Sequence, residues 1–179
     1  MNIAITGTNG FIARHLIESL KAKNINIIKI KRAKDHLGHS KNKFLLNSRG
    51  KNYLKNVDIV IHCAARVHQL NERKEKVEKL YRESNVDSTK ILAKHSIKSG
   101  VKKFIFLSSI KVHGEETQSN KFFNQYSNVN PLDYYAKSKY EAEKELLLLK
   151  KYLKIVIIRP PLVYGPGVGA NFKKIISAV

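Results

Sequence analysis

Short apolar runs alternate with longer amphipathic segments along this chain. The apolar runs are rich in Ile and Val and are bounded by turn residues, a pattern that predicts strands. Strands are expected at Asn2–Thr6, Asn26–Ile30, Phe44–Leu46, Asp58–Cys63, Lys103–Ser108 and Lys154–Ile158, the third on a weak pattern. Apolar residues spaced three and four apart predict helices at Gly10–Lys23, Gly50–Asn56, Lys76–Ser99 and Tyr135–Lys151.

The last three of these strands are apolar at nearly every position, in the runs DIVIHC, KFIFLSS and KIVIIR. Such strands are typical of a parallel sheet that is buried on both faces. Their alternation with helices predicts an α/β fold, a doubly wound parallel sheet with helices on both faces. No internal repeat or Pro/Gly-rich linker interrupts the pattern, so residues 1–179 are expected to form a single domain.

The first predicted strand runs directly into a glycine turn and a helix. Gly7, Gly10 and Ala13 lie at three-residue intervals, which gives the spacing GxxGxxA. A turn of this kind lets the backbone approach a pyrophosphate, and the helix N-terminus adds a partial positive charge. A plain strand-to-helix turn would need glycine only once or twice. The pattern therefore favours a dinucleotide-binding site, with Ala13 at the close contact between helix and strand.

The end of the second predicted strand bears on the choice of cofactor. Dinucleotide-binding folds usually place an acidic residue there, which binds the ribose hydroxyl groups of NAD. This chain has Lys31 and Arg32 instead. A cationic pair favours the 2′-phosphate group of NADP, which gives a slight preference for NADP over NAD. A solvated strand end explains the two residues almost equally well in a chain so rich in lysine.

The run DYYAKSKYEAEKE contains a tyrosine four residues before a lysine twice over. The pairs are Tyr135 with Lys139 and Tyr140 with Lys144. On a helix, positions four apart lie on one face. Tyr140 follows Tyr135 by five residues, a rotation of about 140° around the helix axis. If one pair faces a binding site, the other is therefore turned away from it.

The charge of the chain is unusual. The sequence has 34 basic and 14 acidic residues, a formal net charge of +20. This excess by itself favours a nucleic-acid or anionic-membrane partner. However, the lysines are spread through nearly all predicted elements, and no basic block is interleaved with aromatic residues. A compositional bias explains the charge about as well, so we expect no nucleic-acid partner.

The number of cysteines and the length of the apolar runs indicate the cellular compartment of the protein. Cys63 is the single cysteine, so neither an internal disulfide nor a cysteine-based metal site is expected. The N-terminus lacks the basic and apolar regions of a signal peptide. No apolar run approaches the roughly 20 residues that span a bilayer. We therefore expect a cytoplasmic protein without a metal site or a membrane partner.

Six blocks of the chain together carry a family resemblance. They are ITGTNGFIARHL, DIVIHCAA, ESNVDSTKILA, KKFIFLSSIKVHGEE, YYAKSKYEAEKEL and VIIRPPLVYGPGVGANF. In this order they resemble the extended short-chain dehydrogenase/reductases, the NAD-dependent epimerase/dehydratase family. The resemblance implies a Rossmann-like domain, NAD or NADP as cofactor and a nucleotide-sugar substrate, and it is compatible with a homodimer. Two blocks look most like bacterial enzymes that epimerise or reduce C4 of UDP-sugars for surface polysaccharides.

The resemblance also implies a catalytic triad of Ser109, Tyr135 and Lys139. Ser109 would hydrogen-bond the sugar oxygen at C4, and Tyr135 would move the proton of that hydroxyl group while hydride passes to or from the nicotinamide. An unperturbed tyrosine pKa of about 10 is too high for a base at neutral pH. Lys139 is expected to supply the cation that favours the phenolate and to bind the nicotinamide ribose.

Other positions are carried over from the family. Phe11 and Ile12 fall in the phosphate turn, Asn47 stands near the expected adenine contact, and Asn171 is a candidate substrate contact. The chain would pass the ribose at Cys63, Ala64 and Ala65, and the nicotinamide at Pro160 and Pro161. Cys63 is not expected to be a reactive thiol, and Asn85 is expected to be a structural hydrogen-bonder. Three histidines, His62, His68 and His113, could serve as bases, but the triad makes them redundant.

Two departures from the family pattern narrow these expectations. Dehydratases carry an Asp-Glu pair directly after the Ser/Thr, where this chain has Ile110 and Lys111. Epimerisation or keto reduction at C4 is therefore favoured over dehydration. Chains of this family also continue well beyond the PPLVYGPG block, so most of the substrate domain is expected to be missing. The open interpretations are a fragment of an enzyme, the product of a split gene, or an inactive dinucleotide-binding remnant.

Overall fold

The computed structural model describes residues 1–34, 40–44, 47–48, 51–67, 74–117 and 120–168. Its strands are β1 (Asn2–Thr6), β2 (Asn26–Ile30), β3 (Arg32–Lys34), β4 (Ser40–Phe44), β5 (Asn47–Ser48), β6 (Lys51–Asn52), β7 (Ile59–His62), β8 (Lys103–Leu107) and β9 (Lys154–Ile158). The α-helices are α1 (Phe11–Lys21), α2 (Lys74–Tyr81), α3 (Ser88–Lys98) and α4 (Tyr134–Leu147). A π-helix, η1 (Arg82–Asp87), joins α2 to α3, and a 3₁₀-helix, η2 (Ile110–His113), follows β8.

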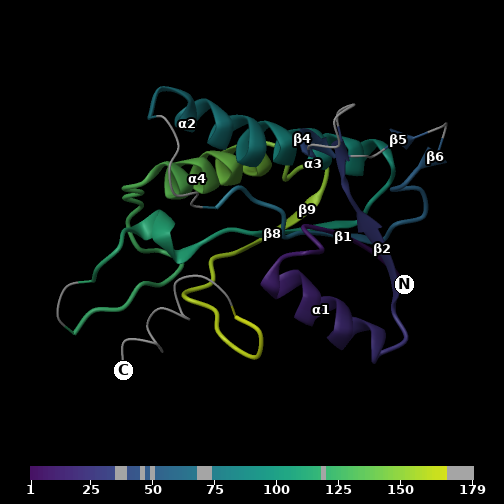
Figure 1. The fold of residues 1–179 in the computed structure, drawn as a ribbon, viewed down its shortest axis with the longest axis horizontal. Coiled ribbons are helices and arrows are strands. Elements are labelled where there is room, and N and C mark those ends of the chain that lie inside the picture. The colour runs from purple at the N-terminus through teal and green to yellow at the C-terminus, as the bar shows by residue number, and fades with distance from the viewer. Residues whose placement is uncertain (35–39, 45–46, 49–50, 68–73, 118–119, 169–179) are drawn as a thin grey trace.

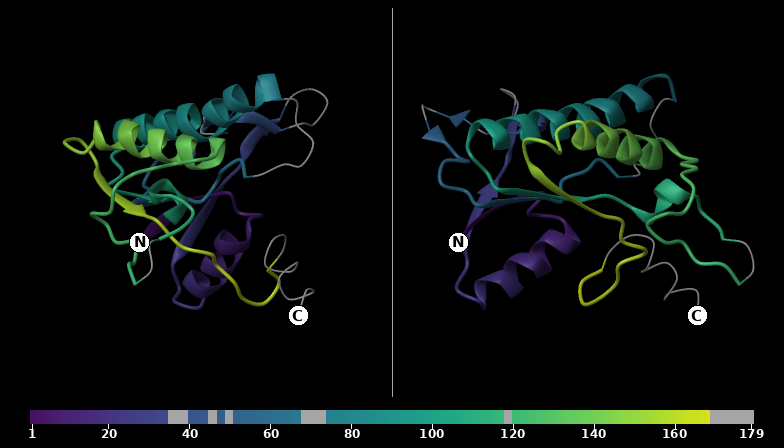
Figure 2. Two further views of the ribbon diagram at one scale, coloured as in Figure 1. Left: turned by 90° about the vertical axis from the view of Figure 1, so that its left-hand side faces the viewer. Right: turned by 180° about the vertical axis from the view of Figure 1, so that it is seen from behind.

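Five strands form a parallel sheet in the order β2-β1-β7-β8-β9. Helix α1 covers one face, while α2, α3 and α4 lie together on the other (Figure 1). The views in Figure 2 show the same three layers from the side and from behind. This arrangement confirms the predicted doubly wound α/β fold. Strand order reverses between β1 and β7, and in such folds ligands bind there, beyond the carboxyl ends of the strands.

The two faces of the sheet have separate cores because side chains alternate along each strand. Ala4, Val60, Phe104 and Phe106 pack with Leu92 of α3 and with Ala142 and Leu146 of α4. Ile3 and Ile5 of β1 point the other way and pack against Ala13 and Ile17 of α1. The helices that carry site residues are thus anchored by buried apolar contacts on both faces.

One prediction of local structure before β7 is wrong, and another lies mostly outside the described residues. The expected helix at Gly50–Asn56 is absent from the part that is described, since residues 51–52 form a strand with β5 and residues 53–56 form turns. Asn56 has φ 63°, which a helix does not accommodate. Of the strand expected at Phe44–Leu46, only Phe44 is described, and it ends β4, which forms an antiparallel hairpin with β3.

A third correction concerns β9, whose apolar sequence predicts burial on both faces. It lies at the edge of the described sheet, and its residues are half-buried or exposed, with Ile158 45% exposed. An apolar sequence does not distinguish an edge strand from a central one. The helix expected at Lys76–Ser99 is present but contains the π-helix η1 between its two α-helical parts. In the described residues, no helix is both long and apolar enough to cross a membrane.

Candidate active site

The glycine turn between β1 and α1 brings two chain segments into backbone contact. Gly7 has φ 68°, and a Cβ built on it would lie 2.6 Å from the backbone nitrogen of Ala64 and 2.9 Å from the carbonyl carbon of Cys63. The amide of Gly10 donates to the carbonyl oxygen of Gly7 at 2.8 Å and closes the turn. Gly10 is the N-cap of α1 and provides no side-chain cap. The first amides of α1 are therefore placed to bind an anion.

We expect Gly7→Ala to be much more destabilising than an alanine at another glycine of positive φ. Gly100, at the end of α3, has φ 74°, and a Cβ at this position would meet no atom within 4 Å, so Gly100→Ala carries only the backbone strain. Gly7→Ala adds a clash with immobile backbone, which costs about 1–3 kcal/mol more. Urea denaturation of both variants measures the difference. Equal losses of unfolding free energy would show that the contact with Ala64 is not tight.

A chain of buried hydrogen bonds fixes the carboxyl ends of β1 and β7. Ala64 donates its amide to Thr6 Oγ1 at 3.2 Å, and Thr6 Oγ1 lies 2.6 Å from His62 Nδ1. On the far side of the ring, His62 Nε2 lies 2.8 Å from Thr89 Oγ1, which donates to the carbonyl oxygen of Asn85 at 2.6 Å. These partners assign the proton of His62 to Nε2. Burial, with the charges of Lys139 and Arg32, holds the pKa of His62 well below its usual value, so the ring is neutral.

The π-helix η1 directs Asn85 towards the segment that follows β7. Its Oδ1 accepts from the amide of Arg66 at 2.6 Å, and its Nδ2 donates to the carbonyl oxygen of Arg66 at 3.0 Å. Nδ2 also donates to Ser138 Oγ of α4 at 2.9 Å. A π-helix inserts an extra residue into the helical register and is frequent at functional sites. Asn85 thereby ties the loop at Cys63, Ala64 and Ala65 to the helix that carries Tyr135.

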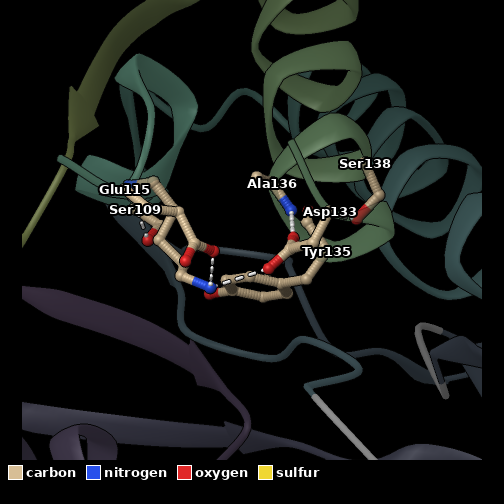
Figure 3. A network of polar contacts seen from close by, with 7 residues as sticks. Ser109, Glu115, Asp133, Tyr135, Ala136 and Ser138 are labelled. Atoms are coloured by element: carbon tan, nitrogen blue, oxygen red, sulfur yellow. Dashed lines mark hydrogen bonds and ion pairs between the residues drawn. The ribbon is translucent and has the colours of Figure 1, made fainter. Parts of the chain in front are cut away.

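Tyr135 extends from the start of α4 towards the segment that carries Ser109 and Glu115 (Figure 3). The N-cap residue Asp133 sets this start, because its Oδ1 accepts from the amide of Ala136 at 2.6 Å. The side chain of Ser109 is near enough to the Tyr135 hydroxyl group to lower its pKa. Ser109 lies directly after β8, at the carboxyl edge of the sheet. The structure therefore brings Ser109 and Tyr135 together, although they are far apart in sequence.

The surroundings of Tyr135 act on its hydroxyl group in opposite directions. Burial raises the pKa of Tyr135, and the charge of Asp133 and the neighbouring Tyr81 act in the same direction. The nearby side chain of Ser109 and the positive charge of Lys111 lower it. On balance the pKa of Tyr135 lies above its usual value, so the hydroxyl group is protonated at neutral pH in the free protein.

Lys139 lies one turn further along α4 and is only 1% exposed. Its Nζ lies 4.0 Å from the centre of the Phe106 ring. Burial lowers the pKa of Lys139 to about 7, against the opposing influence of Glu143 and Cys63. Lys144 is exposed and lies over the Tyr140 ring at 5.0 Å, so the second Tyr-Lys pair faces away from this core.

Glu143, one turn beyond Lys139, anchors a polar network between α4 and β9. It accepts a short hydrogen bond from Ser108 and binds Arg159 through both carboxylate oxygens, at 3.0 and 2.5 Å. Arg159 Nη1 lies 3.0 Å from His113 Nε2, and His113 Nδ1 lies 3.0 Å from the carbonyl oxygen of Asn128. Ser108 and His113 thus have structural partners in this network.

The remaining predicted cofactor contacts surround the same edge of the sheet. Phe11 and Ile12 open α1, where the loop after β9 returns: His15 Nε2 lies 3.0 Å from the carbonyl oxygen of Pro166. Pro160 is half-buried and accepts from the amide of Ile110, whereas Pro161 is exposed. Burial raises the pKa of the Cys63 thiol to about 11, which makes it a poor nucleophile at neutral pH.

The other predicted residues differ in exposure and in their contacts, and two of them lie outside the described part of the chain. Lys31 is exposed, while Arg32 is half-buried and donates to Ser84 Oγ of η1 at 3.2 Å. Burial and the nearby charge of Arg66 lower the pKa of Arg32. Asn47 lies in the short hairpin of β5 with β6. Asn171 and His68 lie outside the described residues.

Sequence reasoning missed the polar partners that hold this site. Asp133 could have been found, because Asp directly before a helix is a typical N-cap. Nothing in the local sequence identified Thr6 and Thr89 as partners of His62, or Arg159 as a partner of Glu143.

Known proteins match this chain over nearly its whole length. The model of the NAD dependent epimerase/dehydratase family matches residues 3–179. A UDP-glucose 4-epimerase of Vibrio cholerae is 42% identical over 187 residues, which cover 99% of this chain and 56% of the relative. An undecaprenol-linked N-acetylglucosaminyl 4-epimerase of Escherichia coli O157:H7 is 26% identical over 99% of this chain and 54% of its own. The chain thus spans little more than half the length of these relatives.

Solved structures show the same fold. The UDP-glucuronic acid 4-epimerase of Bacillus cereus, in complex with NAD, has a TM-score of 0.71 at 25% identity, covering 93% of this chain and 58% of that one. The UDP-N-acetylglucosamine 4-epimerase of Bacillus cereus has a TM-score of 0.78 at 21% identity, covering 99% of this chain and 61% of that one. This chain belongs to the NAD-dependent epimerase/dehydratase family.

Proposed function

We propose that this chain carries the hydride-transfer half of a nucleotide-sugar C4 epimerase or 4-keto reductase, with Tyr135 as the acid/base. The observation that carries the proposal is the proximity of the Tyr135 and Ser109 side chains, at the same edge of the sheet as the Gly7 turn. Relatives named as 4-epimerases of UDP-sugars, one of them bound to NAD, support the substrate and cofactor classes. A role in surface polysaccharide synthesis would follow from such a substrate.

The residues at this edge fit a dinucleotide. The turn at Gly7 leaves no room for a Cβ, and the uncapped start of α1 offers amides to the diphosphate. The backbone of Cys63 to Ala65 would lie beneath a ribose. A nicotinamide bound there would supply the acceptor or donor of the C4 hydride.

Side chains of the site would transfer the proton of the C4 hydroxyl group. In the oxidation direction, Tyr135 accepts the proton of the C4 hydroxyl group, and in reduction it returns a proton to the C4 oxygen. Ser109 would hold that oxygen by a hydrogen bond. Lys139, fully buried one turn further along the same helix, would bind the nicotinamide ribose once the cofactor is in place.

The test is to incubate the protein with NAD(H) or NADP(H) and a panel of UDP-sugars and their 4-keto derivatives, and to follow C4 configuration by NMR. Inversion at C4 identifies an epimerase, and conversion of the 4-keto sugar at the expense of reduced cofactor identifies a reductase. Cofactor binding without any change at C4 would leave only a dinucleotide-binding remnant. The absence of cofactor binding would contradict both functions.

We also propose that Arg32 favours NADP over NAD, because its guanidinium group lies at the carboxyl end of β2 and close to that of Arg66. Replacing Arg32 by Met should weaken NADP(H) binding roughly tenfold through the loss of a charged hydrogen bond, and change NAD(H) binding little. Lys29→Met, at an exposed position of β2, is the matched control. Calorimetric titration with both cofactors checks this, and equal losses for the two cofactors would contradict it.

A further inference from the structure

The ammonium group of Lys111 is fixed by two carboxylates next to the candidate catalytic pair. Lys111 follows Ser109 by two residues, and its amide donates to Ser109 Oγ at 3.3 Å. Its Nζ lies 2.7 Å from Asp133 Oδ2 and 2.8 Å from Glu115 Oε1. The side chain is about one-third exposed, at 34%. A lysine held at both sides in this way has a defined position, unlike most surface lysines.

Asp133 couples this lysine to the helix that carries Tyr135. One carboxylate oxygen of Asp133 caps the first turn of α4 through the amide of Ala136, and the other binds Lys111. Figure 3 shows Glu115 and Asp133, the two ion-pair partners of Lys111, beside the Tyr135 ring. The 3₁₀-helix η2 and the start of α4 are thus joined by a charged contact at the point where Ser109 and Tyr135 meet.

The groups that face Tyr135 come from α2, from η2 with its N-cap residue, and from the N-cap of α4. Ser109 contributes a hydroxyl group, Lys111 the positive charge, Asp133 a negative charge, and Tyr81 of α2 a neighbouring hydroxyl group. Among these groups the positive charge is that of Lys111, whose ammonium group is held by Asp133 at the start of α4. Lys139 is engaged elsewhere, over the Phe106 ring and under the influence of Glu143.

We propose that Lys111 is a positioning residue of this site, whose ammonium group stabilises the negative charge on Tyr135 when that residue has given up its proton. The inference rests on the proposed function, in which Tyr135 is the acid/base. It adds a second cation to the triad implied by the family resemblance, at a place where dehydratases carry an acidic residue.

Lys111 and Lys139 would differ in their protonation at neutral pH. Partial burial disfavours the charged form of Lys111, but the hydrogen bonds and charges of Asp133 and Glu115 outweigh it and raise the pKa of Lys111. Lys111 therefore remains protonated through the neutral range. Lys139, with a pKa of about 7, is only partly protonated there. A constant cation beside Tyr135 would keep its phenolate accessible at a pH where Lys139 has lost its proton.

The direct test is a pH titration of Tyr135 by NMR in protein labelled at the tyrosine ring carbon that bears the hydroxyl group, with Tyr135→Phe to assign the signal. Lys111→Met and Lys111→Gln should both raise the titration midpoint of Tyr135 by about one pH unit. Lys111→Arg should restore it. Lys137→Met, which removes an exposed charge from the same turn of α4, should leave it unchanged.

The NMR titration of Tyr135 does not require turnover. It therefore tests the role of Lys111 independently of the proposed C4 chemistry. A midpoint that is the same in Lys111→Met, Lys111→Gln and the unsubstituted protein overturns the role of Lys111, whether or not the protein is active. A raised midpoint supports that role. If the protein is active, the pH at which the rate of C4 oxidation rises should move upward by the same amount in Lys111→Met, with Lys111→Arg close to the unsubstituted protein.

Discussion

Replacing Tyr135 by Phe is expected to lower the rate of C4 hydride transfer roughly 100- to 10,000-fold, the usual contribution of a positioned acid/base. The variant loses only the hydroxyl group that lies near Ser109. Since the ring and its packing remain, cofactor affinity and the free energy of unfolding should change little. Steady-state kinetics with a UDP-linked 4-keto sugar and reduced cofactor measure the effect.

The chain supplies its own control for this substitution. Tyr140 belongs to the second Tyr-Lys pair, whose lysine, Lys144, is exposed on α4. Tyr140→Phe removes the same atom from the same helix without touching Ser109. It should retain activity within a few-fold of the unsubstituted protein. If Tyr135→Phe and Tyr140→Phe lose activity equally, the assignment of Tyr135 as the acid/base is wrong.

Replacing Lys139 by Met is expected to stabilise the cofactor-free protein, most strongly at acidic pH. Lys139 is fully buried, and its pKa falls from 10.5 in an exposed lysine to about 7. Below that folded-state pKa the full cost of burying the charge is present. Between pH 7 and 10.5 the unfolded chain keeps a proton that the folded chain has released, so stability increases as the pH rises.

A tenfold change in an ionisation constant corresponds to about 1.4 kcal/mol, so the cost of burying the charge of Lys139 in the acidic range is on the order of 3–5 kcal/mol. The stability advantage of Lys139→Met should therefore be largest near about pH 6 and shrink by about half or more near about pH 9. Urea denaturation across this range measures it, with Lys144→Met as an exposed control on the same helix. An advantage that does not vary with pH would show that Lys139 is not titrating in the folded state.

Retaining a destabilising lysine is consistent with a functional role for it. Methionine would fill the space next to Phe106 without the cost of a buried charge, yet the position carries a lysine. Buried groups with displaced pKa values gather at active sites, where the displacement serves the chemistry. Lys139→Met should accordingly be more stable and inactive.

The central sheet could be predicted from the sequence because its strands are short apolar runs with strong local patterns. Strands β1, β2 and β9 begin and end at the predicted residues. The hairpin of β3 and β4 could not be predicted, since the runs RAK and SKNKF are polar and charged. Its pairing comes from contacts between segments, which a local pattern does not contain.

The same distinction applies to the site. The glycine turn and the tyrosine spacing are local features, and both lie at the carboxyl edge of the sheet as the fold requires. The contact of Lys111 with Asp133 joins residues 22 positions apart, and that of Arg159 with Glu143 joins two separate elements. The family resemblance implies Lys139 as the cation for Tyr135, and we propose Lys111, held by Asp133 and Glu115, as a second cation. Charged contacts of this kind depend on how helices pack, not on spacing along one helix.

The most direct test of the proposed chemistry is isotope transfer to C4. The protein is incubated with a UDP-linked 4-keto sugar and reduced nicotinamide cofactor that carries deuterium at the transferable position, and the sugar is analysed by NMR. Both an epimerase and a reductase should place deuterium at C4, and Tyr135→Phe should slow its appearance roughly 100-fold or more. Binding of the cofactor with no deuterium at C4 would contradict the proposal that this chain performs hydride transfer.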